Sequence, residues 1–252
     1  MYKIIFLDLD GTLLSSNKEI SKYNENILKK ISYSTKIVLA SARGFSTIKP
    51  YLEQLNLLND KNYTIAFNGS LVLDNLENKI INVIIKKSNI ILLEKIVKES
   101  PDLEWYYYTY NDRINRKEIE NIDYFVSNNN IYKVVCISSE SQINKLKNEI
   151  AIQLNHNFEM TSSESTRIEF VPKGKTKVDS IKKLLSVLNI NSEEVIAIGD
   201  GENDVEMIEY AGCGIAMGNS KDNVKKVANL ITDTNDNDGV GKILENLLVN
   251  NL

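Results

Sequence analysis

The sequence predicts an α/β protein with a parallel, Rossmann-like sheet and a second α+β module inserted into it. Two short apolar stretches, residues 3–7 and 195–198, each lead into acidic residues, as buried strands of a parallel sheet would present them at one edge. Residues 82–172 instead alternate apolar and polar residues, which is typical of a sheet with one solvent-facing side. We expect a core made of residues 1–81 and 173–252, with an inserted α+β domain at 82–172.

Periodicity predicts the elements of the core. Its first part should hold strands at 3–7 and 36–40, a strand and turn at 63–69, helices at 24–31 and 46–55, and a hairpin of 71–73 with 79–85. Its second part should hold helices at 178–188, 204–211, 222–228 and 240–248, with strands at 195–198, 213–217 and 230–232. Repeated strand and helix units of this kind favour a parallel sheet covered on both faces.

The inserted domain should mix helices with alternating strands. The pattern predicts helices at 90–99 and 142–154, strands at 104–110, 131–137, 158–161 and 167–171, and a partly helical stretch at 111–130. An aromatic run, Trp105 to Tyr108 with Tyr110, lies on one of these strands. Alternate rings could face a substrate, or the rings could form the core of the domain itself.

Composition and charge exclude several classes of function. The 252 residues carry a net charge of −4, which argues against binding to nucleic acid or to a membrane surface. No apolar run reaches the roughly 18 to 20 residues that cross a bilayer, and no signal-peptide pattern is visible. We therefore expect a cytoplasmic protein that binds a small molecule in a local pocket.

The cysteines and the histidine indicate no thiol or imidazole chemistry. Cys136 and Cys213 lie in separate apolar segments, so buried free thiols are expected. His156 is the only histidine and stands in a polar turn, where we expect it to be a bystander. Any acid–base catalysis would then depend on carboxylates.

The first acidic cluster follows residues 3–7. Asp8 and Asp10 are two residues apart and are followed by Gly11 and Thr12, which allow a sharp turn. Two acids so close repel each other when buried, and a hard cation such as Mg²⁺ would relieve the repulsion. The alternative is an ordinary strand followed by an Asp-Gly turn.

Two more strand ends carry polar residues. Residues 199–204, Gly-Asp-Gly-Glu-Asn-Asp, could be a simple helix N-cap, or Asp200 could join Asp8 and Asp10 around one Mg²⁺. Residues 41–44, Ser-Ala-Arg-Gly, open a helix and could bind an anion at its N-terminus, or could be a solvated turn.

Together these stretches resemble the ordered motifs of the haloacid dehalogenase superfamily. The matching segments are residues 8–13, residues 41–43, Lys177 and residues 199–204. More narrowly they are similar to the Cof-type phosphatases, whose large cap is inserted between the second and third motifs. Ala42 and Val178 depart from that pattern, since the family often has glycine at each position.

The resemblance implies a mechanism and a cofactor. Asp8 would attack phosphorus and form an aspartyl-phosphate. Asp10 would protonate the leaving group and then deprotonate water, which needs a carboxyl group that changes protonation near neutral pH. Mg²⁺ would be held by the Asp8 side chain, the Asp10 carbonyl and Asp200, with Asp204 holding the loop directly or through water.

The resemblance also implies a set of phosphate-binding groups. They are the amides of Leu9 and Ala42 and the side chains of Ser41, Arg43, Lys177 and Asn203. Lys173 and Lys175 are alternatives to Lys177, and Arg43 could instead face the inserted domain.

The sequence therefore predicts a Mg²⁺-dependent phosphatase of small phosphorylated metabolites, such as sugar phosphates or phosphorylated cofactors. A phosphosugar mutase or other phosphotransferase of the same superfamily is one alternative. A non-catalytic sensor of phosphorylated ligands is another. Substrate specificity would belong to the inserted domain, because the motifs recognise only the phosphate that all candidates share.

Overall fold

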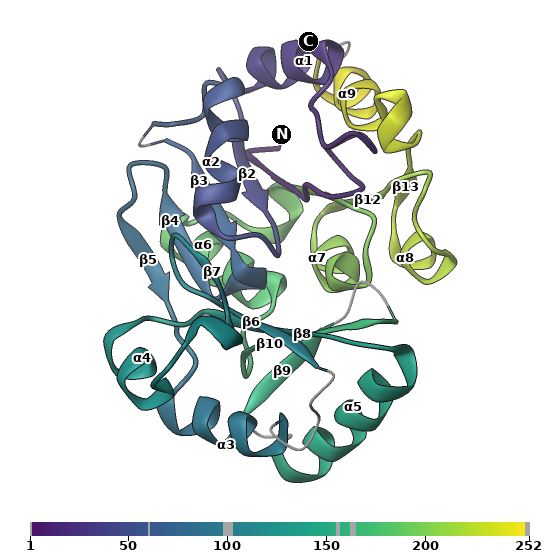
Figure 1. The fold of residues 1–252 in the computed structure, drawn as a ribbon. Helices are drawn as coiled ribbons and strands as arrows, with labels where there is room; N and C mark the ends of the chain where they lie inside the picture. The colour runs from purple at the N-terminus through teal and green to yellow at the C-terminus, as the bar shows by residue number, and fades with distance from the viewer. Residues whose placement is uncertain (1, 60, 98–102, 155–156, 162–164, 250–252) are drawn as a thin grey trace.

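The computed structural model describes residues 2–59, 61–97, 103–154, 157–161 and 165–249. These residues form two separate sheets with their own helices (Figure 1). We refer to the larger sheet and its helices as the core domain and to the smaller sheet with its helices as the cap. The α/β fold predicted from the sequence is confirmed.

The core sheet has eight strands in the order β13-β12-β11-β1-β2-β3-β4-β5. The pairs from β13 to β3 are parallel, and the β3–β4 and β4–β5 pairs are antiparallel. Its strands are β1 (Ile4–Leu7), β2 (Lys36–Ala40), β3 (Tyr63–Ala66), β4 (Leu71–Asp74), β5 (Lys79–Asn82), β11 (Val195–Gly199), β12 (Cys213–Ala216) and β13 (Leu230–Ile231). The chain runs outward from β1 in one direction and from β11 in the other, so a topological switch point lies between them.

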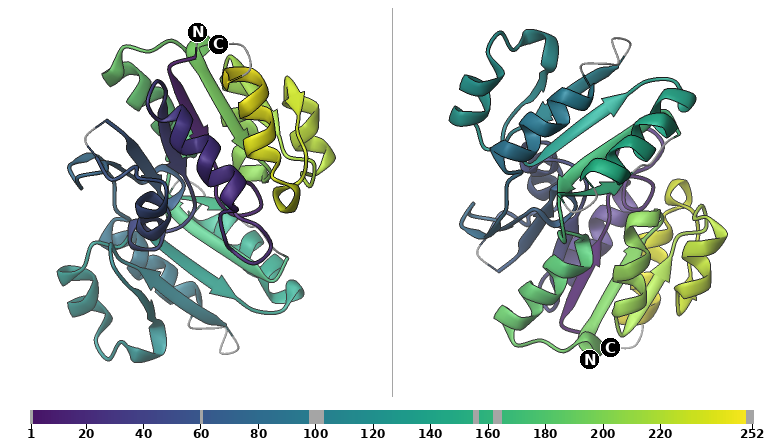
Figure 2. Two further views of the ribbon diagram at one scale, coloured as in Figure 1. Left: turned by 90° about the horizontal axis from the view of Figure 1, so that it is seen from above. Right: turned by 90° about the horizontal axis from the view of Figure 1, so that it is seen from below.

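Helices cover both faces of the core sheet, as both views in Figure 2 show. They are α1 (Lys22–Ile31), α2 (Phe45–Gln54), α6 (Lys177–Leu188), α7 (Val205–Tyr210), α8 (Asp222–Val227) and α9 (Gly239–Leu244). Because side chains alternate along β1, Ile5 and Leu7 pack with α1, α2 and α9, whereas Ile4 and Phe6 pack with α6, α7 and α8. This two-sided burial explains why the core strands are continuous apolar runs.

The cap sheet is antiparallel, with the order β7-β6-β8-β10-β9. Its strands are β6 (Glu104–Tyr108), β7 (Arg113–Asn115), β8 (Lys133–Ile137), β9 (Phe158–Thr161) and β10 (Arg167–Pro172). Helices α3 (Lys87–Val97), α4 (Ile122–Asn128) and α5 (Glu140–Leu154) complete the cap, and α3 and α5 lie on the side of the sheet away from the core domain (Figure 1).

The aromatic run of β6 divides between the two faces of the cap sheet. Trp105 and Tyr107 lie in the hydrophobic core of the cap, beneath its helices. Tyr108 packs instead against the core domain, as does Tyr110 beyond the strand. Trp105 and Tyr107 therefore form part of the cap core, which was one of the two expected roles. Contact with a substrate stays a prediction for the rings on the other face.

The expectation that one face of the cap sheet is exposed to solvent is wrong in part. Lys133 and Glu169, on the face opposite the cap helices, are only 3% and 6% exposed. The physical reason is that the core domain covers this part of the face, since the Lys133 ammonium reaches the Ala42 carbonyl of the core. An alternating pattern shows that two faces differ, but it cannot show what covers the polar one.

The other predicted elements are present with ends shifted by a few residues. Within residues 111–130, α4 confirms the partly helical stretch and the structure adds β7. The last helix ends at Leu244, where a π-helical turn, Glu245–Val249, follows. Cys136 and Cys213 are buried free thiols as predicted. His156 lies outside the described residues. Within the described ranges, no helix is long and apolar enough to cross a membrane.

Because the β6 side chains lie on two different faces of the cap sheet, removing neighbouring rings should have unequal effects on the free energy of unfolding. Trp105→Ala should lower the free energy of unfolding by about 3 to 5 kcal/mol, because it leaves a cavity in the cap core. Tyr106→Ala, on the other face, should change it by less than about 1 kcal/mol. Urea denaturation followed by circular dichroism compares them. Equal losses would contradict this assignment of the faces.

Candidate active site

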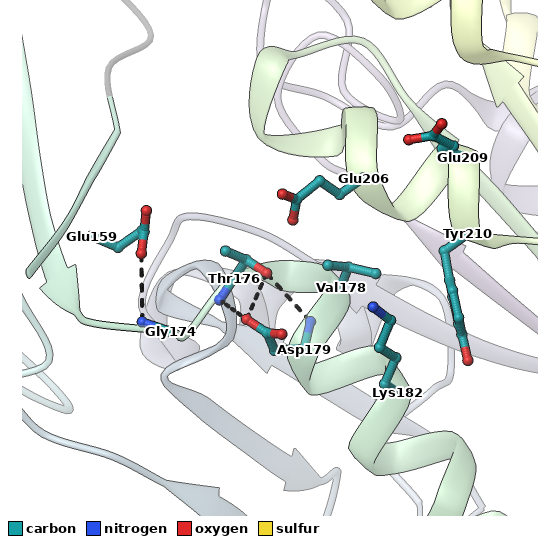
Figure 3. A pocket seen from close by; sticks show the side chains of 9 residues that line it. All are labelled: Glu159, Gly174, Thr176, Val178, Asp179, Lys182, Glu206, Glu209 and Tyr210. Atoms are coloured by element: carbon teal, nitrogen blue, oxygen red, sulfur yellow. Dashed lines mark hydrogen bonds between the residues drawn. The ribbon is translucent and has the colours of Figure 1, made fainter.

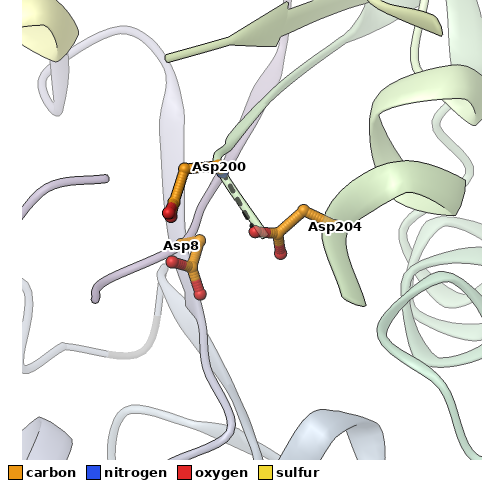
Figure 4. Close-up of side chains that lie close together, drawn as sticks. All are labelled: Asp8, Asp200 and Asp204. Carbon is orange, nitrogen blue, oxygen red and sulfur yellow. Dashed lines mark hydrogen bonds between the residues drawn. The ribbon is translucent and has the colours of Figure 1, made fainter. Parts of the chain in front are cut away.

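The acidic strand ends meet at one edge of the core sheet. Strands β1 and β11 are parallel neighbours, and the Asp8 amide donates to the Ile198 carbonyl at 3.0 Å. Asp8 and Asp200 therefore leave adjacent strands side by side. Oxygen atoms of Asp8, Asp200 and Asp204 all lie within 4.8 Å of one another (Figure 4).

Two glycines allow the loops to approach this closely. Gly11 has a φ of +84°, and a Cβ there would lie 2.4 Å from Asp200 Oδ2. A Cβ on Gly199 would lie 2.5 Å from the Asp204 Cβ. Both distances are shorter than nonbonded atoms allow, so a side chain at either position would push the carboxylates apart.

Asp204 has partners for both of its carboxylate oxygens. Oδ2 accepts hydrogen bonds from the amides of Asp200 at 3.1 Å and Gly201 at 3.0 Å, which closes the loop after β11. Oδ1 accepts from the Lys177 ammonium at 2.6 Å. Asp8 and Asp200, in contrast, each keep one oxygen that accepts no hydrogen bond from the described part of the chain. Those oxygens are available to a ligand.

Lys177 is the cation of this cluster. It is the first residue of α6, where Thr176 and Asp179 form a capping box that fixes the start of the helix. Its ammonium is fully buried and lies 2.6 Å from both Asp8 Oδ1 and Asp204 Oδ1. Lys173, an alternative in the sequence, is half-exposed and pairs with Glu159 instead.

Burial and mutual repulsion both disfavour the ionised acids of the cluster, and Lys177 offsets only part of this effect. Burial, and then the neighbouring Asp204 charge, raise the pKa of Asp8 well above its usual range. Burial also raises the pKa of Asp200 to about 6, although Thr12 donates to its Oδ1 at 2.8 Å. Burial would lower the pKa of Lys177, but Asp204 and Asp8 outweigh it and raise the value. A divalent cation would stabilise the ionised acids.

The chain is similar to known proteins over nearly its whole length. The family model for haloacid dehalogenase-like hydrolases matches residues 5–244. The chain belongs to this family. A putative phosphatase of Haemophilus influenzae is 32% identical over 97% of this chain and 98% of its own length. The 5-amino-6-(5-phospho-D-ribitylamino)uracil phosphatase YcsE of Bacillus subtilis is 30% identical over 96% of this chain and 94% of its own.

Solved structures of the family share the whole fold. A haloacid dehalogenase-like hydrolase from Bacteroides thetaiotaomicron superposes with a TM-score of 0.90 at 30% identity, covering 98% of this chain and all of that one. The likeness therefore includes the cap as well as the core domain.

Asp10 in this hydrolase is held by two cations. Arg43 donates to both of its carboxylate oxygens, at 2.6 and 2.7 Å, and Lys18 donates to Oδ1 at 2.8 Å. Burial alone would raise the pKa of Asp10, but these hydrogen bonds outweigh it and lower the pKa to about 2. Asp10 is therefore ionised near neutral pH. This differs from the expectation of a carboxyl group that changes protonation in that pH range.

The loop after β2 lies beside this ion pair. Ser41 is buried, and its hydroxyl oxygen accepts the Arg43 amide at 3.2 Å. Asn203 contacts the neighbouring β3–β4 connection, where its side-chain amide donates to Asn68 at 3.1 Å. Leu9 and Thr12 are fully buried at the turn after β1.

Sequence reasoning missed several contributors to the site. Thr12 was part of a recognised motif, yet its bond to Asp200 depends on the meeting of β1 and β11. Lys18 and Asn68 both have left-handed backbone angles in turns. A turn at the end of residues 63–69 was expected, but no local pattern shows that Asn68 meets Asn203 across 135 residues of chain.

A separate hollow of about 600 Å³ lies beside α6 and α7 and does not include the acidic cluster (Figure 3). It is lined by Glu159, Gly174, Thr176, Val178, Asp179, Lys182, Glu206, Glu209 and Tyr210. The Thr176 and Asp179 groups there are already paired in the capping box. We assign this hollow no catalytic role.

The raised pKa of Asp200 predicts how the metal-free protein responds to pH. Because its folded pKa of about 6 exceeds the ordinary 3.8, the contribution of this group to stability is present below the ordinary value and is lost as pH rises through about 6. Asp200→Asn keeps an acceptor for Thr12 and removes the charge. Its Tm advantage over the wild type should be larger at about pH 7.5 than at about pH 4.5, by a few °C.

Thermal unfolding in a chelator at both pH values provides the measurement. The same difference in Tm between variant and wild type at each pH would show that Asp200 is not destabilised by its surroundings.

Proposed function

We propose that this hydrolase is a Mg²⁺-dependent phosphatase that removes phosphate from a small phosphorylated metabolite through an aspartyl-phosphate on Asp8. The observation that carries the proposal is the buried Lys177 ammonium between Asp8 and Asp204, at a sheet edge with Asp200. This arrangement keeps Asp8 in position with one oxygen free. It also provides positive charge where a phosphate would approach.

The reaction would proceed in two displacements at phosphorus. In the first, an Asp8 oxygen forms a bond to phosphorus while the ester P–O bond breaks, and the leaving oxygen receives a proton from Asp10. In the second, water attacks phosphorus, Asp10 accepts a proton from that water, and the bond to Asp8 breaks. The products are the alcohol and inorganic phosphate.

The donor set fits Mg²⁺. The carboxylate oxygens of Asp8 and Asp200 without protein partners are hard ligands within reach of one another, and the Asp10 carbonyl accepts no backbone hydrogen bond from the described residues. Both oxygens of Asp204 are already occupied, which supports a role in holding the loop. When bound, Mg²⁺ would offset the repulsion between the Asp8 carboxylate and the phosphate.

The phosphate would be bound by donors around this edge. We assign the task to the Leu9 and Ala42 amides and to the side chains of Ser41, Arg43, Lys177 and Asn203. Arg43 would also affect the protonation of Asp10. If its guanidinium turns from Asp10 to the phosphate, Asp10 loses its strongest donors and its pKa rises, which prepares it to act as an acid.

The cap would select the substrate. The named relatives are phosphatases, and one acts on a phosphorylated ribitylaminouracil, which supports a small phosphorylated metabolite as the substrate class. The polar cap face above the core domain is the large surface left to contact the leaving group. We propose that residues 82–172 form this specificity domain, inserted between core segments 1–81 and 173–252, and that the enzyme works in the cytoplasm.

Asp8→Asn should abolish turnover while leaving the fold intact. Asparagine keeps the shape of the side chain but is not a competent nucleophile, so phosphate release from p-nitrophenyl phosphate should fall at least about a thousandfold. Asp123→Asn, which removes an exposed cap carboxylate, is the matched control. Retention of most activity by Asp8→Asn would exclude this mechanism, and transfer of phosphate between sugar positions in place of release would favour a mutase.

Mg²⁺ should be required for hydrolysis and should also stabilise the fold. At 100 times its dissociation constant, an ion that binds only the folded protein adds about 2.7 kcal/mol. We expect Mg²⁺ to raise the Tm of the wild type and to have little effect on Asp200→Asn, with Asp123→Asn again as control. Thermal unfolding with Mg²⁺ or with EDTA tests this, and an equal Tm rise in Asp200→Asn would rule out the proposed ligand.

A further inference from the structure

The loop that follows β2 has its carbonyls satisfied from two different domains. The Ser41 carbonyl accepts the Asn68 amide at 3.0 Å, and the Arg43 carbonyl accepts the Phe67 amide at 2.9 Å. Both donors belong to the core domain. The Ala42 carbonyl between them accepts the Lys133 ammonium of cap strand β8 at 3.0 Å. One of these consecutive peptide groups therefore depends on the cap.

The peptide group that joins Ala42 to Arg43 is fixed at both ends. Its carbonyl is held by Lys133, and its N–H donates to Ser41 Oγ at 3.2 Å. Because this bond uses a lone pair of the Ser41 hydroxyl, the hydroxyl proton stays free to donate to a ligand. The orientation of this one peptide therefore sets both the Ser41 hydroxyl and the start of the Arg43 side chain, which reaches Asp10.

Lys133 is itself held by several contacts within the cap. Its ammonium lies 3.1 Å from Glu169 Oε2 and 4.7 Å from the centre of the Tyr108 ring, and Arg167 binds the other Glu169 oxygen at 2.9 Å. Lys133 is 3% exposed and Glu169 is 6% exposed. A buried ion pair contributes little net stability, because desolvation offsets the attraction between its charges. The contact of Lys133 with the loop after β2 indicates a role in that loop.

We propose that Lys133 is a positioning residue, which completes the phosphate-binding loop by fixing the Ala42–Arg43 peptide when the cap lies on the core domain. The inference rests on the proposed function, since it assigns phosphate binding to Ser41 and Arg43. It makes the cap more than a specificity surface: the cap supplies a bond that the loop needs to bind any phosphate ester, whatever its leaving group.

Lys133→Met tests this against Lys87→Met, which removes an exposed ammonium on the helix side of the same cap. For Lys133→Met we expect the KM for p-nitrophenyl phosphate and the inhibition constant of inorganic phosphate to rise together by about ten- to hundredfold. Lys87→Met should leave both unchanged. Because these constants do not depend on the fraction of folded enzyme, a merely structural role would lower the apparent kcat and leave them near wild type.

A second variant covers the case in which Lys133→Met does not fold. Lys133→Met with Glu169→Met removes both buried charges, and hydrophobic replacement of a buried pair is commonly tolerated. Whichever variant folds should show the weakened phosphate binding. Values within twofold of wild type in a folded variant would overturn the role of Lys133 while leaving the proposed phosphatase intact. An inactive wild type that does not bind inorganic phosphate would instead overturn the proposed function.

Discussion

The site depends on one buried ammonium. Lys177 lies 2.6 Å from both Asp8 and Asp204, and without it three acids would face one another in a place that water hardly reaches. Removing the cation from such a cluster leaves uncompensated buried charge, which costs several kcal/mol. The same contact links the sequence-distant ends of β1, β11 and α6. Because Lys177 is the first residue of α6, the capping box that fixes the start of this helix also fixes the position of the buried ammonium.

The cap is tied to the core domain by specific contacts beside this cluster. Tyr132 stacks on Phe67 with ring centres 4.9 Å apart and donates to Asn82, and Tyr110 stacks on Phe45. Lys133, the neighbour of Tyr132, reaches the loop after β2. Since these contacts all lie near the carboxyl edge of the core sheet, the position of the cap and the shape of the loop after β2 are physically coupled.

Much of the fold and the site was predictable from local patterns. Apolar runs that end in acids predicted parallel strands, because only a buried strand needs such a run and only its end can present the charges. The acids after the two predicted strands indicated that Asp8 and Asp200 would meet, but the third carboxylate of the cluster is that of Asp204, not that of Asp10. The change to alternating strands at β6, β8 and β10 indicated a second sheet, which the structure contains.

The sequence by itself thus determined the class of fold and the strand ends that carry Asp8 and Asp200, since each depends on residues within one strand or turn, while the choice of Lys177 rested on the family resemblance. Only the tertiary structure decided the partners of these groups. Arg43 and Lys18 pair with Asp10, and Lys133 of the cap donates to the Ala42 carbonyl, through contacts across 33, 8 and 91 residues of chain. No local pattern encodes such pairs, because what brings them together is the packing of whole elements, and with it the burial that sets their charges.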